Sequence, residues 1–286
     1  MKRGKMILFT FILLFVFLFL IRLYIDNDTI KTTKYQINSS KIPSTFDGYK
    51  ILQLSDLHNK NFEKRLFDKI ELEKPDIIVM TGDMVSSNSL DFFNFLSLAQ
   101  KLAEKYPVYY IKGNHEGRLS EEDYKVIDDA LKIYGVKVLD NEKIVLEKEN
   151  KHLNLYGMWC NQRYYSRADA DVNYILKKDT VTKLLGKPNT HEYNVLLMHT
   201  PTYFDAYASW GADLVLSGHI HGGMIRLPFA GGIFSPDRKL FPKYCYGKYS
   251  LGNSTMIISS GLNKGEAGFR FFNQPEIVVV TLKNEK

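Results

Sequence analysis

Cysteine is scarce in this 286-residue chain, which contains only Cys160 and Cys245. The two residues form no Cys-x-x-Cys pair and cannot build a disulfide framework. We expect two free thiols or small buried side chains, since isolated cysteines usually behave as small apolar residues. A single disulfide between them stays open if the domain faces an oxidising compartment.

Other absences narrow the function further. The formal net charge is +6, yet no block of five or six like charges occurs, so nucleic acid is not an expected partner. We find no Gly-rich phosphate loop of the P-loop or Rossmann kind, no internal repeat and no low-complexity tract. What remains is a chain of ordinary composition, with a mildly basic surface suited to anionic phosphates or lipids.

One long apolar run stands at the N-terminus, from Met6 to Ile21. Arg22 and Tyr24 follow it and suit the membrane interface, so we predict a membrane anchor over residues 1–25. Three basic residues precede it (Lys2, Arg3 and Lys5), which predicts a cytoplasmic N-terminus and an extracytoplasmic remainder. A cleaved signal peptide is the alternative, but no small-x-small cleavage site follows the run.

The rest of the chain divides into a short polar segment and one large domain. Residues 26–48 are expected to form a tether, with room for an edge strand around residues 32–37. Residues 49–286 are expected to form the catalytic domain. Its first part alternates short apolar runs with amphipathic segments, a β-α-β rhythm that predicts parallel strands joined by helices. Strands are predicted at 49–54, 76–80, 107–111, 136–139, 195–198, 214–216, 255–258 and 276–280, a hairpin at 144–156, and helices at 62–72, 90–105, 120–134 and within 161–192.

Polar motifs follow five of the predicted strands, which is where open α/β sheets place their sites. The motifs are Asp56-Leu57-His58, Gly82-Asp83, Gly113-Asn114-His115, His199 and Gly218-His219-Ile220-His221. Singly, each has an ordinary explanation: Asp83 could cap a helix and Asn114 could sit in a turn. Jointly, they gather carboxylate, imidazole and amide ligands, which suit Mn, Zn or Fe.

The spacing within the motifs indicates how these ligands would work. Asp56 and His58 are two residues apart and can reach one ion, while the two oxygens of Asp83 can bridge two ions. His115 would stand beside the site and donate a proton to a leaving oxygen. Two metals roughly 3.5–4 Å apart are a known device for phosphate-ester hydrolysis. The sequence therefore predicts a binuclear phosphoesterase that attacks with a metal-bridging hydroxide.

The order of these motifs resembles that of the calcineurin-like metallophosphoesterases, from about Tyr49 to Leu282. The resemblance implies an α/β fold, a four-layer α/β/β/α sandwich, preceded here by one transmembrane helix. It also implies the roles of the motif residues, with His115 protonating the leaving group. One metal would be held by Asp56, His58, Asp83 and His221, and the second by Asp83, Asn114, His199 and His219.

Two later segments, SGHIHGGMIRLPF and FRFFNQPEIVVVTL, resemble the membrane-linked bacterial branch of that family. This branch includes YaeI- and YkuE-like phosphodiesterases and UDP-diacylglucosamine pyrophosphatases. It implies a phosphodiesterase acting on a small phosphoester or a phospholipid-like substrate. The chain departs from the branch at Met224, where a Gln is expected, and at Trp159-Cys160, where an acidic residue is common. Both departures affect the expected substrate pocket, and neither removes a ligand.

Two other functions stay open. A lipid-linked pyrophosphatase is favoured by the anchor and by aromatic residues near the site, although these could belong to the core. A catalytically silent, membrane-tethered metal-binding scaffold would show erosion of the ligand set, and none is seen. The aromatic residues are Phe229, Phe234, Phe241, Tyr244 and Tyr246. Arg118, Arg226 and Lys264 are candidate phosphate contacts, with solvated surface charge as the alternative.

Overall fold

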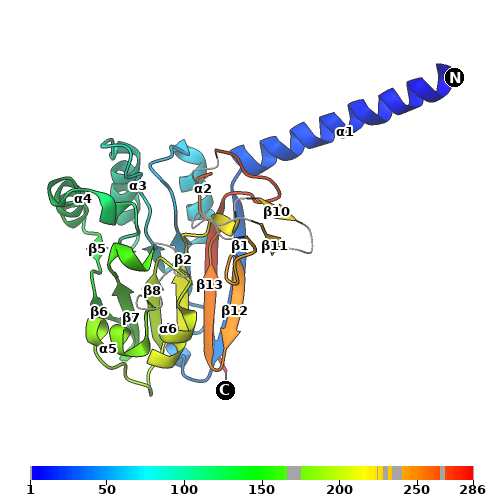
Figure 1. Cartoon of the computed structure of the whole chain (residues 1–286). Helices are drawn as coiled ribbons and strands as arrows, with labels where there is room; N and C mark the ends of the chain where they lie inside the picture. Colours follow the sequence, from blue (N-terminus) through cyan, green and yellow to red (C-terminus); the bar gives the residue numbers. More distant parts are fainter. Residues whose placement is uncertain are drawn as a thin grey trace.

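Two six-stranded β-sheets lie face to face in the computed structural model of the chain (Figure 1). The structure describes residues 2–165, 175–223, 225–227, 231–233, 240–264 and 268–285. The first sheet has the strand order β1-β14-β2-β3-β4-β5, and the second has the order β12-β13-β9-β8-β7-β6. Each sheet thus mixes strands from distant parts of the chain.

The first sheet contains the predicted β-α-β rhythm. Strands β2, β3, β4 and β5 run parallel, and helices α2, α3 and α4 connect them in turn. β14 lies antiparallel to β2, and β1 pairs with β14 in parallel at the edge. The strands are β1 (Lys31–Ser39), β2 (Lys50–Leu54), β3 (Ile77–Met80), β4 (Val108–Tyr110), β5 (Lys137–Val138) and β14 (Glu276–Asn284), and the helices α2 (Glu63–Glu73), α3 (Phe93–Ala103) and α4 (Glu121–Ile133).

The second sheet is built around a parallel core, β7-β8-β9-β13, and carries the predicted hairpin of β6 and β7 at one side. Helix α6 and strand β12 were not predicted, nor was the small β10-β11 ribbon. The strands are β6 (Glu142–Lys148), β7 (Lys151–Met158), β8 (Asn194–Met198), β9 (Leu214–Ser217), β10 (Arg226–Leu227), β11 (Gly231–Gly232), β12 (Gly247–Leu251) and β13 (Ser254–Ile258). The helices are α5 (Lys178–Leu185) and α6 (Phe204–Trp210), and short 3-10 turns occur at Ser44–Phe46, Glu116–Arg118, Gln162–Tyr164 and His221–Gly223.

Alternation along the strands explains the layers. In β8, Val195 and Leu197 point into the core between the two sheets, whereas Leu196 and Met198 point into the core under α5 and α6. In β14, Val278 likewise faces the other sheet and Val279 faces the α2–α4 side. Both sheets are therefore apolar on both faces, as sheets covered on both sides must be. The predicted four-layer α/β/β/α sandwich is confirmed.

Helix α1 (Lys2–Asp28) projects away from the two sheets (upper right in Figure 1). It is long and apolar enough to cross a membrane by length and composition, and its most apolar window is 0% buried. A signal sequence would pass the same test. The helix extends to Asp28, and its last turn is part of the domain because Asp26 and Asn27 are buried. Residues 26–48, expected as a tether, thus contain the helix end and strand β1, both packed on the domain.

The pairing of β1 with β14 makes a prediction about soluble fragments. A fragment that starts at Arg22 keeps Asp26, Asn27 and β1, whereas one that starts at Lys41 loses nine paired residues along β14. Each lost backbone hydrogen bond is worth about 1 kcal/mol, so we expect the shorter fragment to be several kcal/mol less stable or insoluble. Thermal unfolding of both fragments tests this, and equal melting temperatures would contradict it.

Candidate functional site

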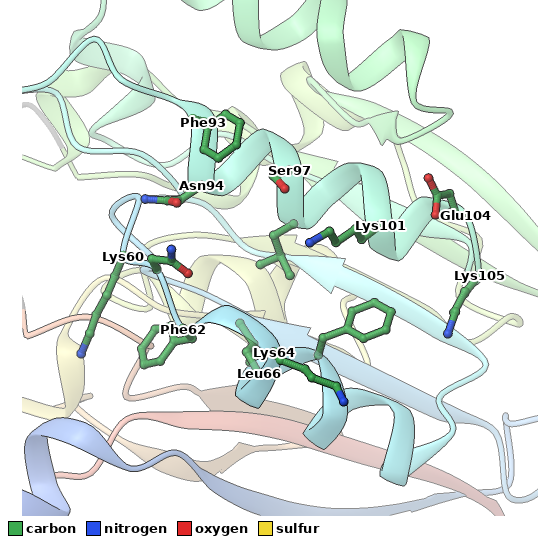
Figure 2. Close-up of a pocket in the computed structure, with 13 residues that line it drawn as sticks. Lys60, Phe62, Lys64, Leu66, Phe93, Asn94, Ser97, Lys101, Glu104 and Lys105 are labelled. Carbon is green, nitrogen blue, oxygen red and sulfur yellow. The ribbon is translucent and has the colours of Figure 1, made fainter.

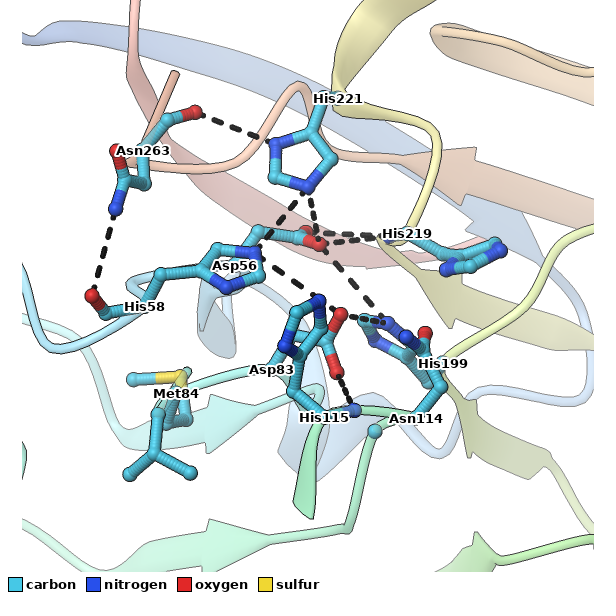
Figure 3. A network of polar contacts seen from close by, with 12 residues as sticks. Asp56, His58, Asp83, Met84, Asn114, His115, His199, His219, His221 and Asn263 are labelled. Atoms are coloured by element: carbon cyan, nitrogen blue, oxygen red, sulfur yellow. Dashed lines mark hydrogen bonds and ion pairs between the residues drawn. The ribbon is translucent and has the colours of Figure 1, made fainter. Parts of the chain in front are cut away.

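Five loops converge at one edge of the sandwich. They follow β2, β3 and β4 of the first sheet and β8 and β9 of the second, so both sheets contribute (Figure 3). All eight polar side chains expected at the site lie together there, and each is at least nine-tenths buried. They are Asp56, His58, Asp83, Asn114, His115, His199, His219 and His221.

The side chains form three overlapping groups of the kind that holds a metal ion. The groups are Asp56-His58-His221, His58-Asp83-His115 and Asp83-His199-His219, with the ligand atoms of each group within 4.8 Å of one another. Asp83 and His58 each belong to two groups. Asp83 Oδ2 lies 3.1 Å from His199 Nε2 and 4.0 Å from His58 Nε2. Asp56 Oδ1 lies 3.4 Å from His221 Nε2.

Backbone carbonyls orient two of the imidazole rings. The Nδ1 atom of His199 lies 2.6 Å from the carbonyl oxygen of Thr81, and that of His221 lies 3.3 Å from the carbonyl oxygen of Asn263. Because a carbonyl only accepts, each Nδ1 carries a proton, and each Nε2 faces the carboxylates, where it can ligate a metal ion once it is deprotonated. Metal-binding histidines are held in this way.

Asn114 gives an independent sign that the site is built for a cation. Its side-chain oxygen is buried and has no hydrogen-bond partner among the described atoms. A buried polar atom left unpaired is costly, so such atoms usually have a partner that completes the site. An amide oxygen, two carboxylates and neutral imidazoles together fit divalent Mn, Zn or Fe.

The ligand loops are strained. Five of the eight residues are non-glycine residues in the left-handed region, at a cost on the order of 1 kcal/mol each. They are Asp56 (φ 52°), His58 (φ 45°), Asp83 (φ 51°), His219 (φ 70°) and His221 (φ 51°). Strain of this kind persists only where the surroundings enforce it, and it clusters at functional sites.

Two glycines allow the loops to approach each other. A Cβ atom on Gly82 would lie 2.6 Å from the backbone nitrogen of Gly113, and one on Gly218 would lie 2.4 Å from Asp56 Oδ2. Real Cβ contacts are never this short, so any side chain at either position would push the loops apart. Glycine at these two positions therefore permits the close approach of the ligand loops.

Burial and charge set the protonation of the cluster. Burial lowers the pKa of His58 and of His221 to about 3, so both rings are neutral. Burial also lowers the pKa of His199, but the neighbouring Asp83 and Asp56 outweigh it and raise the pKa to about 9. Burial raises the pKa of Asp83, yet His199 holds it well below the usual value. The carboxylates of Asp83 and Asp56 thus stabilise positive charge beside His199 Nε2, whether a proton or a metal ion carries it.

His115 differs from the other imidazoles in its hydrogen bonds. The backbone N–H of Ser87 donates to His115 Nδ1 over 3.1 Å, and the Ser87 hydroxyl is also 3.1 Å away. Because Nδ1 accepts, the neutral ring carries its proton on Nε2. Burial lowers the pKa of His115. The ring packs edge-on against His58, with the two centroids 4.5 Å apart, so its proton lies beside the cluster.

Comparison with known proteins agrees with this geometry. A family model for calcineurin-like phosphoesterases matches residues 49–223, more than half of the chain. The chain belongs to the calcineurin-like phosphoesterase family. As a member it is a metal-dependent hydrolase of phosphoester bonds, and the family resemblance and the enzyme class predicted from the motifs are confirmed.

Three bacterial relatives of this phosphoesterase are similar over most of its length. The metallophosphoesterase YkuE of Bacillus subtilis is 31% identical over 278 residues, 91% of this chain and 88% of YkuE. The phosphodiesterase YaeI of Escherichia coli is 29% identical and is covered over 82% of each chain. The metallophosphoesterase Cj0846 of Campylobacter jejuni is 30% identical; the match covers 91% of this chain but 66% of Cj0846.

Glu116 is a site residue that the sequence did not single out. Its fully buried carboxylate accepts four backbone N–H groups: those of Asp83 and Gly113 on Oε2, at 2.9 and 2.8 Å, and those of Met84 and Val85 on Oε1. It therefore joins the loop after β3 to the loop after β4. A glutamate directly after Gly113-Asn114-His115 is visible in the sequence, but its burial is not.

The three candidate phosphate contacts lie in different surroundings. Arg118 is exposed and lowers the pKa of His115, so its charge is felt in the cluster. Lys264 is half-buried and directly follows Asn263, whose carbonyl oxygen contacts His221. Arg226 instead stacks on the ring of Tyr246, 3.7 Å from its centroid. Arg118 and Lys264 thus adjoin the site more directly than Arg226.

One of the departures from the branch, Trp159, lies on a wall of the site. Trp159 stacks on Tyr165, whose ring packs edge-on against His219. Cys160 and Cys245 are both buried and free. Met224, Phe229 and Phe234 lie outside the described residues. An aromatic wall at 159–165 therefore takes the place of the acidic residue expected there.

A groove of about 660 Å³ lies between α2 and α3 (Figure 2). Its walls combine the apolar side chains of Phe62, Leu66 and Phe67 with four lysines: Lys60, Lys64, Lys101 and Lys105. Lys60 follows His58 by two residues, but no candidate ligand is among the described residues that line the groove. The groove therefore borders one ligand loop and is separate from the cluster.

The protonation of the cluster predicts how metal binding depends on pH. Because His199 has a pKa of about 9 without metal, its ring is protonated at pH 7. It must therefore release a proton when a metal binds to Nε2. We expect release of about one proton and an affinity that rises roughly tenfold per pH unit up to about pH 9. His58 and His221, with pKa values of about 3, add no dependence in this range.

Calorimetric titration of Mn²⁺ in two buffers of different ionisation enthalpy measures the proton release. His152→Ala is the matched control, because His152 is exposed and pairs with Glu192 away from the cluster. An affinity that stays constant between pH 7 and pH 9 would show that His199 is not a ligand or that it is already neutral without metal.

Proposed function

We propose that this phosphoesterase is a binuclear phosphodiesterase. One divalent ion is assigned to Asp56, His58, Asp83 and His221, and the other to Asp83, Asn114, His199 and His219. The observation that carries this proposal is the overlap of the ligand groups at Asp83, whose carboxylate faces both His58 and His199. The printed name of YaeI supports a diester substrate.

Two divalent ions, held by these residues, would supply Lewis-acid activation of the phosphoryl group and of the attacking water, so no covalent enzyme intermediate is needed. The chain's own residues do the rest. Asp83 and Asp56 provide fixed negative charge, and the carbonyl oxygens of Thr81 and Asn263 keep His199 and His221 turned towards them. Glu116 fixes the spacing of the two ligand loops that carry Asp83 and Asn114.

His115 is assigned as the proton donor to the leaving oxygen. The backbone N–H of Ser87 donates to Nδ1, so the proton of the neutral ring is on Nε2, beside His58 and Asp83. General acid catalysis of this kind contributes typically 10²–10⁴-fold. Because His115 also belongs to a ligand group with His58 and Asp83, an experiment must separate proton donation from metal binding.

We also propose that α1 is an uncleaved single-pass anchor, with the N-terminus cytoplasmic and the catalytic domain outside. Support comes from the exposed apolar surface of α1 and from the basic residues in its first turns. Phe19, within the apolar run, packs against Phe271 of the domain, with ring centroids 5.4 Å apart. The neighbouring Phe269 and Phe272 are exposed beside this contact. The domain would therefore lie close to the lipid surface.

A domain that lies close to the lipid surface could also have a second activity. This activity is hydrolysis of a lipid-linked pyrophosphate of the UDP-diacylglucosamine type. The observation in its favour is the contact between α1 and residues 268–273, which adjoin the ligand cluster. A silent metal-binding scaffold has no such support, because it predicts erosion of the ligand set and all eight candidate residues lie together.

A substrate comparison tests the proposed reaction. We expect the full-length chain in detergent, loaded with Mn²⁺ or Zn²⁺, to hydrolyse bis-p-nitrophenyl phosphate, and Asp83→Ala to abolish turnover. His115→Ala should lose about 10²–10⁴-fold on diesters with poor leaving groups while keeping its metal content. His152→Ala should behave as the wild type. Loss of a metal in His115→Ala would make His115 a ligand instead, and turnover of the lipid pyrophosphate alone would favour the second activity.

The topology has its own test. We expect the intact mass of the mature protein to include residues 1–25, the protein to resist alkaline extraction from membranes, and external protease to reach its domain in spheroplasts. These results follow from an anchor that spans the bilayer once, with its basic end inside. A mature N-terminus within residues 20–30 would indicate a signal peptide, and protection from the protease would place the domain in the cytoplasm.

A further inference from the structure

The foot of α1 and the candidate metal ligand His221 are joined by one continuous chain of hydrogen bonds. We propose that Asn27 and Arg270 are positioning residues for His221, so that the end of the apolar helix is a working part of the active site. The importance of His221 rests on the proposed function, but the chain of contacts itself does not. It has three steps.

The first step joins α1 to the loop before β14. Asn27 makes two reciprocal bonds with the backbone of Arg270: its Nδ2 donates to the carbonyl oxygen over 3.0 Å, and its Oδ1 accepts from the N–H over 2.9 Å. One residue earlier, Asp26 accepts from the N–H of Phe272 over 2.6 Å. Both side chains are buried, although they end an otherwise exposed apolar helix. The helix end thus fixes the backbone of residues 270–272.

Arg22 strengthens this clamp from one turn earlier in α1. Its guanidinium pairs with Asp26 through two bonds of 2.7 and 2.5 Å, and its Cζ atom lies 4.6 Å from the centroid of the Phe272 ring. A bidentate pair with a buried carboxylate is geometrically specific. The last two turns of α1 therefore hold the loop at three points.

The second step is the guanidinium of Arg270, which points inward while Phe269 and Phe272 on either side are exposed. It is fully buried and donates to backbone carbonyls: Nε to Asn263 over 3.0 Å, Nη2 to Ser260 over 2.6 Å, and Nη1 to Asn273 over 3.3 Å. Nη2 also donates to Asn263. The planar fork thus sets the direction of the Asn263 carbonyl group.

The third step reaches the cluster. The carbonyl oxygen of Asn263 that Arg270 holds is the one that faces His221 Nδ1, 3.3 Å away (Figure 3). Asn273, in the same loop as Arg270, donates from Nδ2 to the carbonyl oxygen of His221 over 2.6 Å. The loop that contains Asn263 and Asn273 therefore fixes both the ring orientation and the backbone position of His221. With Nδ1 as the donor, Nε2 faces Asp56 at 3.4 Å, as a metal ligand should.

The test reads the state of His221 directly. In the metal-free, full-length protein in detergent, ¹⁵N-histidine spectra distinguish Nδ1–H from Nε2–H imidazole, and His221→Gln assigns the signal. We expect Nδ1–H in the wild type, and a substantial share of Nε2–H in Asn27→Ala and in Arg270→Gln. We expect Arg270→Lys to lie between them, because an ammonium group can still donate to Asn263 but lacks the fork.

Metal affinity is the second readout. Loss of an outer partner of a metal-bound histidine costs about 10–100-fold in affinity, so we expect one of two Mn²⁺ ions to bind at least ~10-fold more weakly in Asn27→Ala. Thr29→Val is the matched control: Thr29 joins the same helix end to Gln274 without touching Arg270. It should leave both tautomer and affinity as in the wild type.

Two results would overturn the proposal: a wild-type His221 protonated at Nε2, or an unchanged Nδ1–H signal in Asn27→Ala that remains folded. If Arg270→Gln fails to fold, Asn27→Ala decides alone, since it leaves the guanidinium in place. The tautomer is measured in the metal-free protein, without turnover. Failure of the proposed phosphodiesterase activity and failure of this positioning role therefore give different results.

Discussion

The carboxylate of Asp83 is the group on which both halves of the site depend. One oxygen accepts the backbone N–H of His115 over 2.8 Å, and the other faces His199 of the second sheet and His58 of the first. A buried charge in this place is tolerable only because its neighbours compensate it. The surrounding loops bring compensating groups to Asp83 from both sheets. Glycines allow these loops to come close, and the Glu116 carboxylate holds two of them together.

Backbone strain and buried charge are concentrated at one edge of the sandwich. Three apolar cores, one between the sheets and one on each outer side, supply the stability that this edge lacks. Left-handed candidate ligands, and an Asn114 oxygen with no partner among the described residues, would be improbable in a region selected only for stability. Their concentration where five strands end indicates a site held ready for its ions by the surrounding fold.

The apolar helix is connected to this edge as well. Phe271 packs against α1, while Arg270 beside it reaches the carbonyl group that orients His221. One loop thus has an outer face suited to lipid and an inner face at the cluster. The division into anchor, tether and catalytic domain that the sequence predicts is therefore less sharp in the molecule, because the helix end and β1 are packed into the domain.

Much of the fold and most of the site follow from the sequence because they are local. Short apolar runs and helical spacing predict strands and helices one segment at a time, and the ligand motifs stand directly after their strands. The parallel pairing of β1 with β14, the burial of Glu116 and Arg270, and the stacking of Arg226 on Tyr246 join residues far apart in the chain. A sequence shows that a glutamate or an arginine is present, and its neighbours along the chain look the same whether it is solvated or buried. Only the tertiary structure decides which backbone groups surround it, because those groups come from other strands and loops.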